Sequence, residues 1–206
     1  MTGSARPDGV VVNLAVHRNN VGCHARPQIA AEGFDGFGRA FPAAGLTEAA
    51  SLLGLPAEWG NGAPDNVVCE GQVIELGSAE SVATVYVVGA CSGGSAREVL
   101  RLSLSAEVVA EVQVELGDFL HREPMAGNTL FAAAEFLYDI GGRTERRARP
   151  RLWTFAAPLP APVRCDRLSL PNNPDVHIFG LWLSTADGRT DAGSLQPVTR
   201  HGRTRN

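Results

Sequence analysis

The sequence predicts an all-β protein: a single-domain jelly-roll β-sandwich with long loops and at most one or two short helices. Three observations support this prediction. Apolar residues alternate with polar ones at the two-residue period of a strand, turn-forming residues recur at short intervals, and no segment shows the strand–helix alternation of a parallel sheet. The 206 residues suit one domain, and a hydrophobic content of 44% is enough for a full core.

Strand patterns cover most of the chain. The run 81–91 is almost continuously apolar, which is typical of a central strand buried on both faces. The stretches 98–105 and 111–116 alternate cleanly, so each is expected to bury one face and to expose the other. In chain order, we predict strands at 8–16, 66–76, 81–91, 98–105, 111–116, 151–159, 164–171 and 176–184.

Helical signals are weak. Residues 46–55 place leucines on one side after Thr47, a candidate N-cap, and therefore predict a short helix or a turn. Residues 129–139 have helical propensity but lie between long loops, so a helix and a strand both remain open.

The sandwich is expected to occupy residues 10–185. Residues 1–9 are predicted to form a flexible N-terminus, and the polar, arginine-rich residues 186–206 a loose C-terminal tail. The first residues lack the apolar core of a secretory signal, and no stretch has the roughly 20 apolar residues that cross a bilayer. We therefore expect a cytoplasmic protein that does not interact with membranes.

Charge and cysteine usage exclude further classes. The net charge is −4 and the 18 basic residues, all arginine, are mostly scattered, whereas a nucleic-acid groove needs clustered positive charge. One local exception is the run "RTERRARPR" at 143–151. The four cysteines are widely spaced and form no CxxC pair, so reduced thiols are predicted.

Six motifs occur in an order that resembles a known family. They are "HRNNVG", "FDGFGRAFPAAGL", "PDNVVCEGQVIEL", "VYVVGACSGG", "LGDFLH" and "LPNNPDVHIFGLWL". Together they resemble the galactose-binding-like (discoidin-like) jelly-roll accessory domains of bacterial glycoside hydrolases, over roughly residues 10–184. The resemblance implies the jelly-roll fold and carbohydrate binding. The chain departs from the family pattern at His17-Arg18, where relatives carry an aromatic residue before the Asn pair.

A first polar cluster contains Asn19, Asn20 and Asp35. Their oxygens are candidate ligands for a structural Ca²⁺, which takes six to eight oxygen atoms. With only Asp35 and Glu32 as carboxylates, we expect turn formation instead, because Asn and Asp side chains bond to nearby backbone amides. No other cofactor is predicted.

A second polar cluster combines the segments "GDFLHREPMAGN" and "RARPRLW". Sugars bind to an aromatic platform with surrounding hydrogen-bonding groups, and these segments contain both kinds of side chain. The candidate ligand-binding residues are Trp153, Arg151, Arg149, Asn128 and His121. A solvated charged loop beside a core tryptophan is the alternative interpretation.

An enzymatic interpretation uses histidines. His121 is a candidate general base, with Asp118 orienting it, and Arg151 would hold an anion. His17 and His177 are further catalytic candidates if the first and last strands lie side by side. A histidine next to an apolar run, as His177 is, more often forms part of the core.

Two functions therefore stay open. The first is a stand-alone module that binds a carbohydrate or a glycosylated or otherwise polar small molecule. The second is a small enzyme of specialised metabolism, of the cyclase, lyase or isomerase type, with His/Asp/Arg acid–base chemistry on the same jelly roll. In either case the partner is a small molecule rather than a nucleic acid, and a homodimer is left open.

Overall fold

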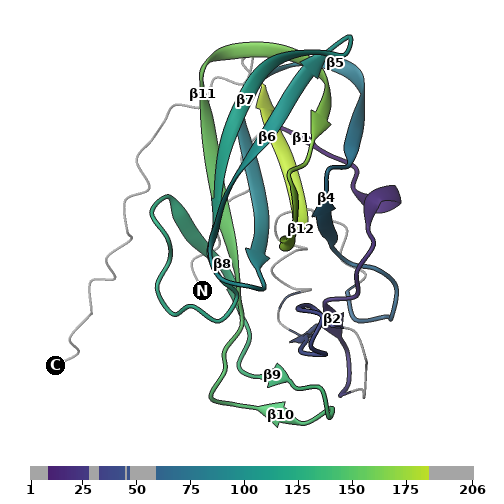
Figure 1. Ribbon diagram of the computed structural model, residues 1–206, viewed down its shortest axis with the longest axis vertical. Helices are drawn as coiled ribbons and strands as arrows, with labels where there is room; N and C mark the ends of the chain where they lie inside the picture. Colours follow the sequence, from purple (N-terminus) through teal and green to yellow (C-terminus); the bar gives the residue numbers. More distant parts are fainter. Residues whose placement is uncertain (1–8, 28–32, 45, 47–58, 186–206) are drawn as a thin grey trace, which may run out of the picture.

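The computed structural model describes residues 9–27, 33–44, 46 and 59–185, and within them it confirms an all-β sandwich fold (Figure 1). One short 3₁₀ helix, η1 (Ala15–His17), follows the first strand. The strands are β1 (Val10–Val11), β2 (Cys23–His24), β3 (Phe41–Pro42), β4 (Val67–Glu70), β5 (Val73–Cys91), β6 (Ala96–Leu104), β7 (Glu107–Leu116), β8 (Asn128–Ala133), β9 (Leu137–Tyr138), β10 (Thr144–Glu145), β11 (Arg151–Ser169) and β12 (Asn172–Thr185).

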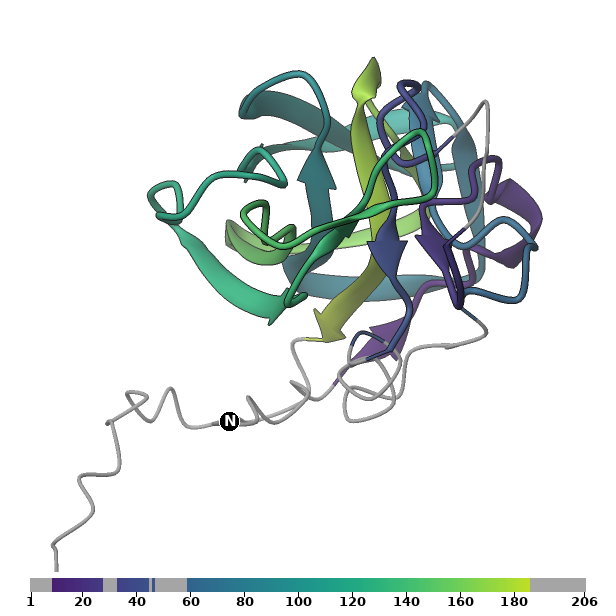
Figure 2. The ribbon, with the colours of Figure 1, turned by 90° about the horizontal axis from the view of Figure 1, so that it is seen from below.

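The main sheet is antiparallel and has the order β1-β12-β5-β11-β6-β7, with β4 paired to β12 and β8 paired to β11. Seen from below, its strands curve around a common core (Figure 2). The pairs β9–β10 and β2–β3 form two small separate sheets. The first strand lies beside the last, since Val10 pairs with Leu183.

Two long strands connect the layers of the fold. The residues at the start of β11 pair with β8 and those at its end pair with β6, while β5 lies along most of its other edge. Register shifts between Pro158 and Val163 let β11 bend between these partners. The predictions of separate strands at 151–159 and 164–171 are therefore wrong, and the predicted strand 66–76 divides into β4 and the start of β5.

The core follows the predicted alternation up to Leu102, where a register shift interrupts it and Ser103 is buried. Leu100 and Leu102 of β6, and Val112 and Val114 of β7, are all buried, whereas Arg101 between the leucines is exposed. The run 81–91 forms the end of β5, between β11 and β12, as expected for a central strand. Burying one face of each strand supplies the apolar surface that stabilises the sandwich.

Other local predictions differ from the structure or fall on residues outside its described part. Residues 129–139 begin in strand β8, and the predicted strand 8–16 is reduced to two paired residues followed by η1. Most of the predicted helix 46–55, the segment 1–8 and the tail 186–206 lie outside the described residues. In the described part of the chain, no helix has both the length and the apolar character needed to cross a membrane.

All four cysteines are free and buried, in agreement with the prediction of reduced thiols. Burial raises the pKa of the Cys91 thiol to about 12, with smaller increases from nearby carboxylates. Thiols in such surroundings are protonated at neutral pH and are poor nucleophiles.

Candidate functional site: an arginine-lined hollow

A hollow of about 420 Å³ lies between the loop after β7 and the loop that joins β10 to β11. These loops are at the end of the sandwich from which β9 and β10 extend (Figure 1). The volume of the hollow falls in the range of small-molecule binding sites. Four of its six lining residues are arginines, and none is acidic. The lining residues, which we call the arginine hollow, are Leu120, Arg122, Arg147, Ala148, Arg149 and Arg151.

Two loops form the arginine hollow and are held together by hydrogen bonds. One loop follows β7 and the other joins β10 to β11. The backbone N–H of Arg151 donates to the carbonyl of Phe119 at 2.7 Å. The Arg151 guanidinium donates to the carbonyls of His121, at 3.0 Å, and Arg149, at 2.9 Å. Arg151 therefore fixes the distance between the two walls, while the remaining arginines are exposed.

The charge of the arginine hollow is not neutralised by the described part of the chain. Ion pairs occur at five other arginines, on the sheet surface and in turns, and none involves Arg122, Arg147, Arg149 or Arg151. Guanidinium groups present several donors in a plane that matches carboxylate and phosphate oxygens. An anion is therefore the ligand that this arrangement favours.

The structure brings together only part of the predicted second cluster. Arg149 and Arg151 line the arginine hollow, and the His121 carbonyl lies at its edge. Arg147 was not among the predicted binding residues, although the run "RTERRARPR" contained the signal for it. A run of arginines in one loop does not by itself indicate a site, because the second loop that encloses it is known only from the structure.

The structure does not support the predicted sugar platform at Trp153. The side chain is fully buried, with 1% of its surface exposed, and its indole N–H donates to the Asp118 carbonyl at 3.1 Å. Asn128 is also buried, and its amide joins the Gly117 N–H to the Glu115 carbonyl. Neither residue can contact a ligand in this structure, because other parts of the chain cover both.

Asp118 and His121 do not form the predicted acid–base pair. The two carboxylate oxygens of Asp118 accept the backbone N–H groups of Leu120, at 2.7 Å, and Gly94, at 3.0 Å. The ring of His121 instead meets the Ser95 hydroxyl, at 3.3 Å from Nδ1. Asp118 thus shapes the turn that carries Leu120 and Arg122.

The candidate calcium ligands form turns and strand contacts. Asn19 bonds to both backbone groups of Val68, and the Asn20 amide donates to Asn66 at 3.4 Å. The oxygens of Asp35 accept the backbone N–H groups of Phe37 and Arg39 and the Arg39 guanidinium. Across the described residues, no three or more His, Cys, Asp or Glu side chains are grouped so that they could hold a metal.

His177 belongs to a buried polar network at the same end of the sandwich. Its Nδ1 lies 3.0 Å from the Asn66 carboxamide oxygen, and its Nε2 lies 3.3 Å from the Ser92 hydroxyl. Asn66 in turn donates to Asp65, whose oxygens also accept the N–H groups of Gly22 and Cys23. We call Asp65, Asn66, His177 and Ser92 the histidine network.

Burial dominates the electrostatics of the histidine network. Desolvation lowers the pKa of His177 to about 4, against a smaller opposing effect of Asp35. Burial also raises the pKa of Asp65, although its hydrogen bonds act in the opposite direction. Neither ring nitrogen of His177 bonds to His17, which lies half-buried in η1. The predicted proximity of the first and last strands therefore does not create a histidine pair.

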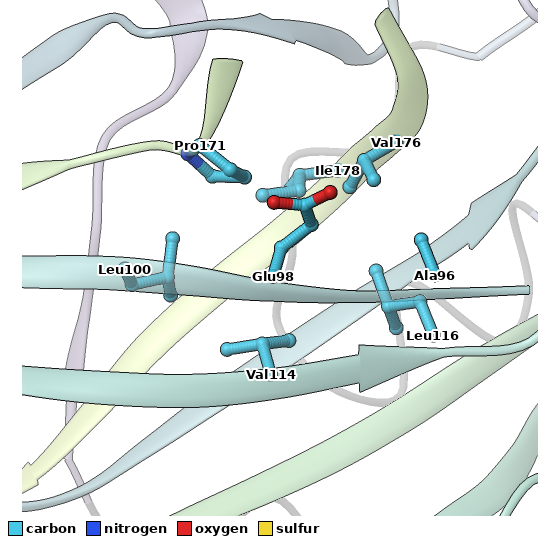
Figure 3. A pocket seen from close by; sticks show the side chains of 8 residues that line it. All are labelled: Ala96, Glu98, Leu100, Val114, Leu116, Pro171, Val176 and Ile178. Atoms are coloured by element: carbon cyan, nitrogen blue, oxygen red, sulfur yellow. The ribbon is translucent and has the colours of Figure 1, made fainter. Parts of the chain in front are cut away.

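A second cavity, between β6, β7 and the start of β12, is too small for a ligand. Its volume is about 10 Å³, which is room for roughly one water molecule. Figure 3 shows the Glu98 carboxylate among apolar side chains that include Pro171 and Ile178. The Asn173 amide donates to this carboxylate at 2.6 Å. We interpret the cavity as a packing feature of the core edge.

Comparison with known proteins does not assign the chain. No protein-family model matches it, and no curated protein matches it.

Proposed function

We propose that this protein is a β-sandwich binding module for an anionic carbohydrate or an anionic glycosylated small molecule, held in the arginine hollow. The observation that carries the proposal is the set of four arginines around about 420 Å³, without an acidic residue in the lining. The resemblance of the six motifs to galactose-binding-like accessory domains supports the carbohydrate part of the proposal. The absence of an ion pair to these arginines within the described part of the chain supports the anionic part.

The recognition chemistry follows from the arginines. Arg122, Arg147 and Arg149 present their guanidinium groups from two loops, so an anionic group between them would receive donors from more than one side. Because Arg151 already bonds to two carbonyls, we assign to it the positioning of the walls. A uronic acid and a sugar phosphate share this chemistry, since each carries an anionic oxygen group on a polar ring.

Calorimetric titration tests the proposal. We expect binding of galacturonate oligomers or of glucose 6-phosphate, weaker binding at high salt, and no binding of neutral glucose. Arg149→Ala should weaken binding about 10- to 100-fold, the effect of losing a hydrogen bond between charged groups. Tighter binding of one of these two sugars shows whether the anionic group of the ligand is a carboxylate or a phosphate.

Arg101→Ala is the matched control. Arg101 is also exposed on this chain, but it pairs with Glu111 at 3.0 Å on the β6–β7 hairpin. This variant should bind as the wild type does. Equal binding of neutral and anionic sugars, no binding of any of them, or an unchanged affinity of Arg149→Ala would contradict the proposal.

A further inference from the structure

The hydroxyl of Ser92 lies at the surface end of the histidine network. Ser92 directly follows β5, and its side chain is partly exposed. The surrounding turn is fixed, since the Ser92 N–H donates to the Asp175 carbonyl at 2.9 Å and the Cys91 N–H donates to the Gly117 carbonyl at 3.0 Å. The Ser92 Oγ therefore has a defined position beside the His177 Nε2, at 3.3 Å.

The network determines which nitrogen of His177 carries the proton. The Asn66 amide nitrogen donates to the Asp65 carboxylate, at 2.8 Å, and to the Asn20 carbonyl, at 3.2 Å. Both partners are acceptors, so the orientation of this amide is fixed and its oxygen faces His177 Nδ1. The Asn20 amide nitrogen also lies near Nδ1, but at a longer 3.4 Å, and it donates to the Asn66 oxygen at the same distance. The shorter contact of Nδ1 with the Asn66 oxygen assigns the proton to Nδ1, which leaves the lone pair of Nε2 directed at the Ser92 hydroxyl.

The ring of His177 is also held in place by packing. It is 3% exposed, and the Phe34 ring lies against it with 4.1 Å between ring centres. A base, a hydroxyl and a third group that orients the base are the elements of an activated serine. Here the third group is a carboxamide rather than a carboxylate.

We propose that Ser92 is a nucleophile with His177 as its general base, Asn66 as the positioning residue, and activated carboxylic esters as the class of substrate. Ser92 was not a sequence candidate, and this activity goes beyond the binding proposed for the arginine hollow. Because Asn66 carries no charge, the imidazolium that forms during attack is weakly stabilised. Esters with a good leaving group, such as aryl esters, are therefore the expected substrates.

The reaction is balanced without a further reagent except water. The Ser92 Oγ bonds to the ester carbonyl carbon and its proton passes to His177 Nε2. The bond from that carbon to the leaving oxygen then breaks, and the leaving oxygen takes the proton from Nε2. Water next attacks the acyl-serine and gives a proton to Nε2, the bond to Oγ breaks, and Oγ recovers the proton as the carboxylic acid leaves.

Ser95 and His121 provide an internal comparison for Ser92 and His177. Ser95 Oγ also lies 3.3 Å from a histidine, but it faces Nδ1 of the exposed His121. Ser95 Oγ accepts the Asp118 N–H at 3.0 Å, and no third group is seen to orient the His121 ring among the described residues. Ser95 is thus a serine with a histidine neighbour but without an ordered base.

The test is labelling with 4-nitrophenyl acetate and with a fluorophosphonate, followed by peptide mapping of the full chain. We expect an adduct on Ser92, at least about tenfold more than on Ser95, and a burst of 4-nitrophenol equal to the protein concentration. Ser92→Ala should lose the adduct and the burst, and Ser95→Ala should retain both. No adduct on Ser92, or equal labelling of the two serines, would overturn the proposal.

The pH dependence of labelling needs no variant and separates a base from simple surface reactivity. The charged groups around the His177 ring are Asp35, Asp65 through Asn66, and Asp175 through Ser92. With a pKa of about 4, His177 is neutral from pH 8 to pH 5, so the labelling rate should be constant there and fall towards pH 4. A rate that rises about tenfold per pH unit would show attack by a serine without a base and contradict the proposal.

A competing hydrogen bond provides a third measurement. The Ser92 hydroxyl also lies 3.4 Å from the Asp175 carboxylate, which would draw its proton away from His177. Asp175→Ala should label at least as fast as the wild type, because Asp175 is exposed and its carboxylate is not part of the proposed step. Loss of labelling in Asp175→Ala would assign the base to Asp175 and overturn the role of His177.

Discussion

The histidine network and the arginine hollow lie at the same end of the sandwich, and they use polar residues in opposite ways. In the network, Asp65 and Asn66 are buried and their hydrogen-bonding atoms face partners within the chain. In the hollow, Arg122 and Arg149 are exposed and form no ion pair within the described chain. The first arrangement stabilises the fold, and the second keeps its binding capacity available for another molecule.

Of the two sites, the buried histidine network is expected to show the largest effect on stability. Asp65→Ala removes the acceptor of the Gly22 and Cys23 N–H groups, and two buried donors without a partner cost on the order of 4 kcal/mol. Urea unfolding measures the loss. Asp139→Ala is the control, because Asp139 accepts a similar set of bonds from Gly141 and Arg143 in an exposed turn. Equal losses of unfolding free energy in Asp65→Ala and Asp139→Ala would contradict the prediction that burial makes the Asp65 hydrogen bonds more stabilising.

Acid should weaken the fold through His177. Its pKa is about 4 in the folded protein and about 6.5 when unfolded, so the unfolded chain binds more protons between these values. The contribution of His177 is complete above pH 6.5 and falls by about 3 kcal/mol as the pH drops to 4. Asp65, with a raised pKa, acts in the opposite direction and reduces the net change.

Two measurements check this pH prediction. Urea unfolding between pH 7 and pH 4 reports the net loss of stability. Nitrogen NMR of the His177 ring should show the neutral form, with the proton on Nδ1, at pH 5. A charged ring at pH 5 would show that the network is more hydrated than its burial indicates.

The smallest effect on stability is expected in the arginine hollow. Arg122→Ala and Arg149→Ala should each change the free energy of unfolding by less than about 0.5 kcal/mol, because both side chains are exposed and neither forms an ion pair with another described residue. Arg151→Ala should cost more, since its guanidinium joins the two loops. If the three variants were equally destabilised, the hollow would be a structural element rather than a binding site.

The sequence was a good guide where neighbouring residues decide the outcome. The alternation in 98–105 and 111–116 predicted both strands and most of their buried faces. The exception is Ser103, which the alternation places on the exposed face but which is buried beside a register shift after Leu102. The turn-forming role of Asp35 was also predicted, and its carboxylate accepts the N–H groups of Phe37 and Arg39. Asn19 differs from the prediction, because it bonds to the backbone of Val68, 49 residues away, and not to nearby amides. The division into strands was less accurate, since a bend in β11 does not interrupt its pairing with β5.

The candidate sites depended on contacts that the sequence does not display. Trp153 resembled an exposed platform, but Gly117 and its neighbours pack directly against the indole ring. Ser92 was not predicted as a site residue. It lies in a glycine-rich turn, 85 residues from the histidine that it faces. Motif spacing cannot reveal such a pair, because the two residues meet only when β12 aligns beside β5.

The sequence by itself determined that this protein is all-β and which strand faces are apolar, because those properties follow from the two-residue period of an extended chain. It also supplied the local arginine run of the hollow. Only the tertiary structure decided that Trp153 is covered, that Arg122 and Arg149 line one hollow, and that His177 lies between Asn66 and Ser92. The physical reason is that burial and hydrogen-bond partners are set by strand pairings between residues far apart in the chain.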